Sequence, residues 1–327
     1  MTKAHGGDAT KTIGVGLIGL GVVGGSVERA FHARAARLDA AAGVPLRLIG
    51  VCEKMESRWP GSHAPVTANA FDLLDDPSIQ IIVESIGGMS PARDLILAAF
   101  ERGKHVVTAN KELVAKSWNE LHEAARLAKR ELRFEASVMS AAPVIAGTRM
   151  LGASRVSVLR GILNGTTNYI CTKMEGGLDF DTALKEAQDA GYAEKPNASA
   201  DVDGFDPSYK LAILISILEG RWFSPENVRR TSLGTVEPSA FVEAAKRNRT
   251  IRYVAAADFG DKAVKARVGP EEVERDSLEA RCTGPMNVLT LETDLAGQLT
   301  FRGPGAGGDA AASALIGDVI AIARRHA

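Results

Sequence analysis

Residues 191–217, GYAEKPNASADVDGFDPSYKLAILISI, contain the side chains best suited to acid–base chemistry. Lys210 follows Asp206 by four residues, so a helix that starts at Asp206-Pro207 places both side chains on one face. We expect Asp206 to be the N-cap and Pro207 the first helical residue. On spacing alone, the pair is typical of a capped helix with a surface ion pair, worth about a few tenths of a kcal/mol.

The surroundings of Lys210 favour a catalytic interpretation. Acids precede it at Glu194, Asp201 and Asp203, and the helix that follows is apolar nearly all round, which predicts burial. A lysine at the start of a buried helix, among carboxylates, is a candidate general acid with a shifted pKa.

A second lysine, Lys111, lies in VVTANKEL. A strand ends before it, Thr108 and Asn110 can cap, and Lys111 begins a helix. Ligands of open parallel sheets bind beyond the carboxyl ends of the strands, so Lys111 can face a substrate. Cations are disfavoured at helix N-termini, and position alone therefore favours a solvated lysine.

The stretch NGTTNYI, residues 164–170, has a turn composition and follows an apolar strand-like run at 156–163. A plain connector needs one Gly or Asn. So many small hydrogen-bonding groups suit a turn that holds a small polar molecule.

A glycine loop, GLGVVG, follows an apolar run and opens a helical pattern. Gly19 permits a tight turn, Gly21 allows backbone N–H groups to approach a pyrophosphate, and Gly24 allows close packing of helix on strand. This context favours nucleotide binding over a structural glycine turn. The cofactor-binding residues that we expect are Gly19, Gly21, Val22, Val23, Gly24, Glu53, Gly87, Thr108 and Gly307.

The end of the second strand bears on the choice between NAD and NADP. Glu53 can bind a ribose 2′-hydroxyl, whereas Lys54 and Arg58 suit a 2′-phosphate. We favour NAD, although a solvated strand end is equally compatible with these residues.

The order of the strands and helices that must position these residues changes along the chain. Strand-like runs at 12–18, 45–53, 78–86, 104–110 and 132–140 alternate with helical stretches. This predicts an α/β domain with a Rossmann-type, doubly wound parallel sheet. Beyond residue 148, a strand at 155–163, helices at 182–191 and 207–220, and strands at 253–259, 262–269, 287–295 and 298–303 indicate an α+β domain. We expect domains at 1–147 and 148–302, and a C-terminal loop and helix at 303–327.

The composition excludes several classes of protein. The 327 residues carry 39 basic and 40 acidic side chains, a net charge of −1, which gives no basic surface for nucleic acid or anionic membrane. No apolar run reaches the length of a membrane span, and residues 1–11 lack the apolar core of a signal peptide. Three scattered cysteines suggest a reducing compartment. We expect a cytoplasmic protein with a small-molecule substrate.

Together these motifs resemble homoserine dehydrogenase over nearly the whole chain, from about residue 12 to 325. GKHVVTANKELVA, GILNGTTNYI, GYAEKPNASADVDGFDPSYKLAIL and GPGAGG occur in that family's order, and the second and third are specific to it. The resemblance implies NAD(P)-dependent interconversion of L-homoserine and L-aspartate 4-semialdehyde, on the pathway to threonine and methionine. It also implies a homodimer formed by the central domain, and a C-terminal helix that returns to the Rossmann domain.

The resemblance also implies roles for single residues. Lys210 and Lys111 match the catalytic lysines, with Lys210 as the proton donor to the aldehyde oxygen in reduction. The acids Glu194, Asp201 and Asp206 would hold the substrate ammonium and orient Lys210. Gly165, Thr166 and Tyr192 would line the substrate pocket. A monovalent cation, usually sodium, would bind largely to backbone carbonyls at Glu135, Val138, Ser140 and Ala142.

Three features depart from the family pattern. Residues 139–143 read MSAAP where the family is often glycine-rich, the 194–206 loop is one residue longer than usual, and the chain ends at 327 without the regulatory ACT domain of longer members. We therefore expect no threonine feedback through such a domain. The first departure supports the alternative of a paralogous NAD(P)-dependent dehydrogenase of another small amino or hydroxy acid. A nucleotide-binding protein without catalysis would lack the lysines.

Overall fold

The computed structural model describes residues 12–193, 198–260 and 263–326. Their contacts form two compact units. Among the described helices, none combines the length and the apolar character that a membrane crossing requires. Unit 1 comprises residues 12–109, 120–133 and 315–326, and unit 2 comprises the described residues of 110–119 and 134–314.

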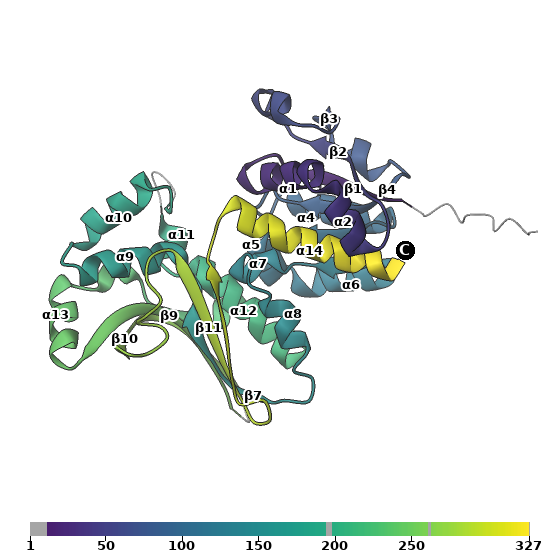
Figure 1. Ribbon diagram of the computed structural model, residues 1–327. Helices are drawn as coiled ribbons and strands as arrows, with labels where there is room; N and C mark the ends of the chain where they lie inside the picture. Colours follow the sequence, from purple (N-terminus) through teal and green to yellow (C-terminus); the bar gives the residue numbers. More distant parts are fainter. Residues whose placement is uncertain (1–11, 194–197, 261–262, 327) are drawn as a thin grey trace, which may run out of the picture. The chain divides into compact units, whose positions relative to one another are not determined.

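Unit 1 is built on a parallel sheet with the strand order β3-β2-β1-β4-β5-β6, of which Figure 1 labels β1 to β4. The order reverses between β1 and β4, which is the switch point where ligands of such sheets bind. The buried strands β1, β4 and β5 confirm the predicted apolar runs. The strands are β1 Ile13–Ile18, β2 Leu46–Cys52, β3 Val66–Thr67, β4 Ile79–Glu84, β5 His105–Thr108 and β6 Leu132–Arg133.

Helices connect the parallel strands of unit 1 and pack on the sheet. Helix α1 contacts β1 and β2, and α4 contacts β4 and β5. Helix α2 ends at Gly43, whose φ of 79° is the left-handed conformation that closes many helices. The helices that contribute to this unit are α1 Val22–Ala33, α2 Ala35–Ala42, η1 Glu56–Gly61, α3 Ala70–Leu74, α4 Ala92–Glu101, and parts of α6 Trp118–Ala128 and α14 Gly308–His326.

Unit 2 contains a mixed sheet with the order β12-β11-β7-β9-β10-β8. Its neighbours are antiparallel except β8 and β10, which are parallel. This confirms the predicted α+β layer, with longer β9 and β10 than expected. The strands are β7 Val156–Ile162, β8 Arg229–Arg230, β9 Arg249–Phe259, β10 Val264–Glu274, β11 Met286–Thr293 and β12 Gln298–Pro304.

Helices α9, α12 and α13 pack against β9 of this sheet. Residues 211–215 of α12 are completely buried, as its apolar composition predicts. The helical segments of unit 2 are α5 Lys111–Lys116, α7 Ala136–Met139, α8 Val144–Arg149, α9 Gly165–Glu175, α10 Phe180–Asp189, α11 Ser199–Val202, α12 Phe205–Glu219, η2 Pro225–Asn227, η3 Leu233–Thr235 and α13 Pro238–Lys246.

The strand predicted at 132–140 is wrong beyond Arg133. Ser137 donates its backbone N–H and its hydroxyl to the carbonyl oxygen of Phe134, at 3.0 and 2.6 Å, which turns the chain into α7. Ser140 then adopts a φ of 49° and turns the chain again. Local hydrogen bonds of serine therefore override the apolar, strand-like composition.

Candidate active site

Two lysines meet on the carboxylate of Asp206 within unit 2. Lys111, the first residue of α5, places Nζ 2.6 Å from Asp206 Oδ1, and Lys210 places Nζ 2.8 Å from Asp206 Oδ2. Lys210 Nζ also donates to the carbonyl oxygen of Leu163 at 2.8 Å. The i,i+4 pair predicted between Asp206 and Lys210 therefore forms, but it is buried and shared with a third group.

Burial and charge set the protonation of this group. Burial alone would raise the pKa of Asp206, but the charges of Lys111 and Lys210 outweigh it and hold that pKa well below its usual range. Burial lowers the pKa of the Lys210 amine, against the attraction of Asp206. An ammonium has three N–H bonds, and Asp206 and Leu163 take two of those of Lys210. The third has no acceptor among the described residues and can serve a ligand.

The predicted N-cap of this helix is wrong. Helix α12 begins at Phe205 after Gly204, which has a φ of 80°, and no side chain caps it. Asp206 lies inside the first turn, where its carboxylate faces the lysines. The sequence pattern Asp-Pro is correct for a helix start, but tertiary pairing with two lysines determines the orientation of Asp206.

The NGTT stretch is the first turn of helix α9 and not a free turn. Asn164 is the N-cap, and its Oδ1 accepts the backbone N–H of Thr167 at 2.8 Å. The Nδ2 of Asn164 donates to Asp201 at 2.7 Å and to Asp206 at 2.8 Å. The polar stretch that indicated a binding site is therefore hydrogen-bonded, through Asn164, to the acids around Lys210. The bridging role of Asn164 is one that the sequence alone does not indicate.

The residues predicted to line the substrate pocket lie around this helix start. A Cβ on Gly165 would lie 2.7 Å from the carbonyl oxygen of Pro285, so only glycine fits. The hydroxyl of Thr166 donates to the carbonyl oxygen of Tyr192 at 2.6 Å. Tyr192 is 43% exposed. Glu194 lies outside the described residues.

The other two acids of this stretch differ in role. Asp201 on α11 is largely buried, and burial followed by the charge of Asp206 raises its pKa, against the hydrogen bond from Asn164. Asp203 ends α11 and accepts the hydroxyl of Ser232 at 2.7 Å. The structure therefore groups Asp201, and not Asp203, with the lysine cluster.

The glycine loop of unit 1 has the geometry that its motif requires. Gly19 has a φ of 100°, and a Cβ on Gly24 would lie 1.9 Å from the carbonyl oxygen of Gly19. Gly21 is the N-cap of α1 without a side-chain cap, and Val22 is 79% exposed. Val23 follows in the first turn of the helix. The backbone N–H groups at the start of α1 are thus arranged for an anion.

Glu53 lies immediately after β2 and contacts this loop directly. Its carboxylate accepts the backbone N–H of Leu20 at 2.8 Å and that of Met55 at 2.9 Å, and pairs with Arg58 at 3.2 Å. Burial opposes ionisation, but these donors lower the pKa of Glu53. An ionised carboxylate therefore lies beside the glycine loop.

A further acid, Glu84 at the end of β4, was missed from the sequence. Glu84 is fully buried, and its carboxylate accepts the hydroxyl of Thr108 and the backbone N–H groups of Ile86 and Gly87, the last two at 2.8 and 2.9 Å. The signal was a carboxylate at the end of an apolar strand. Glu84 positions Gly87 and Thr108, two predicted cofactor-binding residues. Gly307, with a φ of 129°, precedes α14 in unit 2.

The predicted cation ligands lie together between β6 and α8. Glu135, Val138, Ser140 and Ala142 are all buried. The Glu135 carboxylate accepts the backbone N–H groups of Ile145 and Ala146, each at 2.8 Å, so its side chain stabilises the start of α8. A carbonyl oxygen has two lone pairs, and the all-oxygen backbone set suits a hard cation. The carbonyl oxygen of Ala142 already accepts the backbone N–H of Val144 at 2.8 Å and keeps one lone pair, and the cation site stays a prediction.

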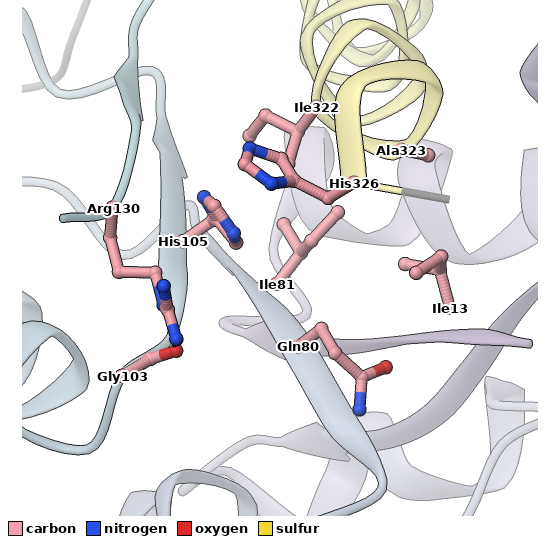
Figure 2. Close-up of a pocket in the computed structure, with 9 residues that line it drawn as sticks. All are labelled: Ile13, Gln80, Ile81, Gly103, His105, Arg130, Ile322, Ala323 and His326. Atoms are coloured by element: carbon pink, nitrogen blue, oxygen red, sulfur yellow. The ribbon is translucent and has the colours of Figure 1, made fainter. Parts of the chain in front are cut away.

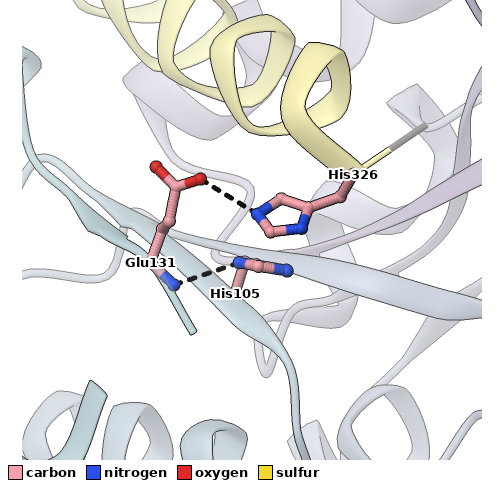
Figure 3. A group of neighbouring side chains, drawn as sticks. All are labelled: His105, Glu131 and His326. Atoms are coloured by element: carbon pink, nitrogen blue, oxygen red, sulfur yellow. Dashed lines mark hydrogen bonds and ion pairs between the residues drawn. The ribbon is translucent and has the colours of Figure 1, made fainter. Parts of the chain in front are cut away.

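A second cluster of titratable groups lies within unit 1, formed by His105, Glu131 and His326 (Figure 3). Glu131 donates its backbone N–H to His105 Nδ1 at 3.0 Å, so Nε2 carries the proton of the neutral ring. A metal on Nε2 would need the proton on Nδ1, which this hydrogen bond forbids. The Glu131 carboxylate also pairs with Arg133 and Arg325. The group is therefore poorly suited to a metal ion.

A pocket of about 210 Å³ adjoins these histidines (Figure 2). Ile13, Gln80 and His105 line it and lie at the amino-terminal ends of β1, β4 and β5. Burial, followed by the charges of His326 and Arg130, lowers the pKa of His105 to about 4. The pocket thus lies at the amino-terminal ends of the strands, whereas the glycine loop follows the carboxyl end of β1.

Comparisons with known proteins agree with this geometry. A family model described as homoserine dehydrogenase matches residues 143–320, and one described as the NAD-binding domain of homoserine dehydrogenase matches residues 19–135. Homoserine dehydrogenase of Mycobacterium leprae is 40% identical over 325 residues, which cover 97% of this chain and 73% of that protein. The enzyme of Corynebacterium glutamicum is 36% identical over 321 residues, or 95% of this chain and 72% of that protein.

Solved structures give the same result. A homoserine dehydrogenase from Thiobacillus denitrificans superposes with a TM-score of 0.93 at 36% identity, covering 97% of this chain and 74% of that one. A putative homoserine dehydrogenase from Archaeoglobus fulgidus gives 0.84 at 29% identity, covering 95% and 99%. Because one family model spans more than half of the chain and relatives above 30% identity span nearly all of it, the chain belongs to the homoserine dehydrogenase family of nicotinamide-dependent oxidoreductases.

Proposed function

We propose that this protein interconverts L-homoserine and L-aspartate 4-semialdehyde with NAD(P), and that Lys210 transfers the proton at the substrate oxygen. The observation that carries the proposal is the buried Lys210 amine, 6% exposed, with two acceptors fixed on Asp206 and Leu163 and one N–H direction left for a ligand. A small amino acid with a hydroxyl or aldehyde oxygen fits that direction.

The lowered pKa of Lys210 suits both directions of the reaction. In oxidation, the neutral amine accepts the proton of the hydroxyl, and in reduction the ammonium returns it to the aldehyde oxygen. A bound nicotinamide supplies or accepts the hydride. Asp206 fixes the Lys210 amine, and Lys111 keeps Asp206 ionised, so that Asp206 does not compete for the transferred proton.

The other substrate groups need partners of opposite charge. In the proposal, Asp201 binds the substrate ammonium because, among the described residues, it is the acid of this cluster that does not pair with a lysine at short distance. Gly165 and Thr166 line the pocket at the start of α9, and Tyr192 closes it. Glu194 retains its proposed role as a second acid for the ammonium.

We favour NAD as the cofactor because Glu53 is ionised and buried beside the glycine loop. A carboxylate there accepts hydrogen bonds from ribose hydroxyls and repels a 2′-phosphate. Arg58 works against this preference, since its guanidinium lies 3.2 Å from Glu53 and could bind a phosphate. Gly19, Gly21 and Gly24 serve either cofactor.

The remaining proposals concern the cation, the assembly and the location. A monovalent cation such as sodium would be held by backbone carbonyls at Glu135, Val138, Ser140 and Ala142. We propose a homodimer formed through the domain at 148–302, with the segment at 303–327 returning to the domain at 1–147. Three free, buried cysteines suit the cytoplasm.

A substrate panel tests the function. We expect purified protein with NAD or NADP to oxidise L-homoserine with a kcat/KM far above that for L-serine, L-threonine and 4-hydroxybutyrate. 4-Hydroxybutyrate has the same carbon chain without the ammonium, so its poor turnover would support the carboxylate site. Preference for another small amino or hydroxy acid would instead support the paralogous dehydrogenase, and it would direct attention to residues 139–143.

A further inference from the structure

The side-chain amide of Asn164 joins two carboxylates of the candidate active site. Its Nδ2 lies 2.7 Å from Asp201 Oδ1 and 2.8 Å from Asp206 Oδ2. An amide nitrogen has two N–H bonds, so one points to each acid. Asn164 and Asp206 are both buried, so the hydrogen bond between them is shielded from water, whereas the one to Asp201 is only partly buried.

The orientation of this amide is fixed by the helix that it caps. Asn164 Oδ1 accepts the backbone N–H of Thr167 at 2.8 Å and the Thr167 hydroxyl at 3.0 Å. A backbone N–H only donates, so Oδ1 must face α9 and Nδ2 must face the acids. The N-cap hydrogen bond thus determines which group Asn164 presents to Asp201 and Asp206.

The two acids differ in how many of their carboxylate oxygens already accept a hydrogen bond. Asp206 Oδ1 accepts from Lys111, and its Oδ2 accepts from both Lys210 and Asn164. Asp201 accepts from Asn164 through Oδ1, while its Oδ2 has no partner among the described residues. Asp201 is therefore the acid that can bind a cationic group of the substrate.

We propose that Asn164 is a positioning residue, which aims Asp201 at the substrate ammonium and keeps Asp206 directed at the lysines. This inference rests on the proposed function, because it assumes a substrate with an ammonium group. It goes beyond that function by assigning separate roles to Asp201 and Asp206. It also assigns Asn164, the first residue of the NGTT stretch, the task of orienting both acids.

The chain provides a matched control for the substitution. Asn164→Ser keeps an N-cap oxygen but is too short to bridge the acids. In α10, Asp179 caps in the same way, with Oδ1 accepting the Thr182 backbone N–H at 2.8 Å and Oδ2 accepting the Thr182 hydroxyl at 2.9 Å. Asp179→Ser therefore also replaces an N-cap side chain by serine away from the lysine cluster, with the loss of one charge as an added change.

The kinetic experiment compares both variants with the wild type. We expect Asn164→Ser to lower kcat/KM for L-homoserine on the order of 10²-fold, chiefly through KM, because misplaced binding groups cost about that much. NAD binding should be unchanged, and Asp179→Ser should match the wild type in all three quantities. Equal KM values for Asn164→Ser and Asp179→Ser would overturn the positioning role.

A second readout does not depend on turnover. In ¹³C-aspartate-labelled protein without substrate, Asn164→Ser should raise the pKa of Asp201, because a donor to its charged form is lost. An unchanged Asp201 titration would overturn the bridge. If the wild type neither binds nor oxidises L-homoserine but the Asp201 titration shifts as expected, the proposed function fails while the bridge stands.

Discussion

Replacing Asp206 by asparagine removes one charge from the lysine cluster without creating a cavity. Asp206 is 5% exposed and pairs with Lys210 at 2.8 Å and with Lys111 at 2.6 Å. Removing one partner of a buried ion pair costs about 3–5 kcal/mol, because the other charge stays buried. Solvent screens the Lys111 pair, since that side chain is 43% exposed, so we expect a loss of about 3 kcal/mol at neutral pH.

The matched control is an ion pair with the same spacing on a more exposed helix face. Glu112 and Lys116 form an i,i+4 pair at 2.6 Å on α5, with side chains about one-third exposed. Glu112→Gln should lower the free energy of unfolding by about 0.5 kcal/mol or less. The difference between the two variants isolates the effect of burial from that of helical spacing.

The loss in Asp206→Asn should also depend on pH. Without Asp206 the pKa of Lys210 in the folded state falls further below its unfolded value. The unfolded chain then binds more protons between those two values, so the stability of the variant rises with pH through that window. The deficit against the wild type should therefore shrink at alkaline pH, by far more than that of Glu112→Gln, which is about 0.5 kcal/mol or less at any pH.

Urea unfolding at fixed protein concentration, at neutral and alkaline pH, measures both effects. If Asp206→Asn leaves too little folded protein, the double variant Asp206→Asn/Lys210→Met serves instead. The double variant removes both charges of the buried Asp206–Lys210 pair, so it should be more stable than Asp206→Asn alone. A loss in Asp206→Asn no larger than in Glu112→Gln, at every pH, would refute the reasoning.

Three other variants test the cofactor site, the histidine cluster and the helix start. Glu53→Gln should weaken NAD binding about tenfold and leave NADP binding unchanged or stronger, because a charged hydrogen-bond acceptor is lost. Fluorescence titrations that show equal effects on both cofactors would exclude Glu53 from recognition of the ribose. In the wild type, burial lowers the pKa of His105 from its ordinary value of 6.5 to about 4 in the folded state. The unfolded state therefore binds more protons between these two values, and the free energy of unfolding rises with pH across that window by at most about 3.4 kcal/mol. His105→Asn keeps an acceptor for Glu131 and should lack this rise in urea unfolding; an identical pH dependence would contradict it. Gly165→Ala should lower the free energy of unfolding by about 1–3 kcal/mol, because the new Cβ crowds the carbonyl oxygen of Pro285. Gly152→Ala, whose Cβ would meet nothing within 4 Å, should lower it little, and similar thermal unfolding of the two variants would contradict the close approach at Gly165.

The parallel sheet of unit 1 could be predicted because burial on both faces leaves continuous apolar runs. The runs at 12–18 and 78–86 became β1 and β4 with ends shifted by one or two residues. The segment 132–140 was not predictable by composition, since the hydrogen bonds of Ser137 to Phe134 end the strand. Side chains such as serine compete with neighbouring strands for backbone hydrogen bonds, and the apolar periodicity of a segment does not indicate where this happens.

The candidate site was predicted in its members but not in its connections. Lys111 and Asp206 are far apart in the chain, and no spacing rule indicates that they pair. Asn164 belongs to a stretch of turn composition, and its role as an N-cap that also bridges two acids depends on the start of α9 lying beside Asp201 of α11 and Asp206 of α12. The buried acid Glu84 was missed because one charge at a strand end is usually solvated.

The most direct test is the turnover of Lys210→Met with L-homoserine and NAD, followed by the absorbance of the reduced nicotinamide. Methionine keeps the length and apolar stem of the side chain but cannot carry a proton. We expect kcat to fall by about 10²–10⁴-fold, the usual range for a general acid or base, with the Kd for NAD unchanged. A variant that binds NAD normally and turns over at a rate near that of the wild type would show that Lys210 is not the proton-transfer group.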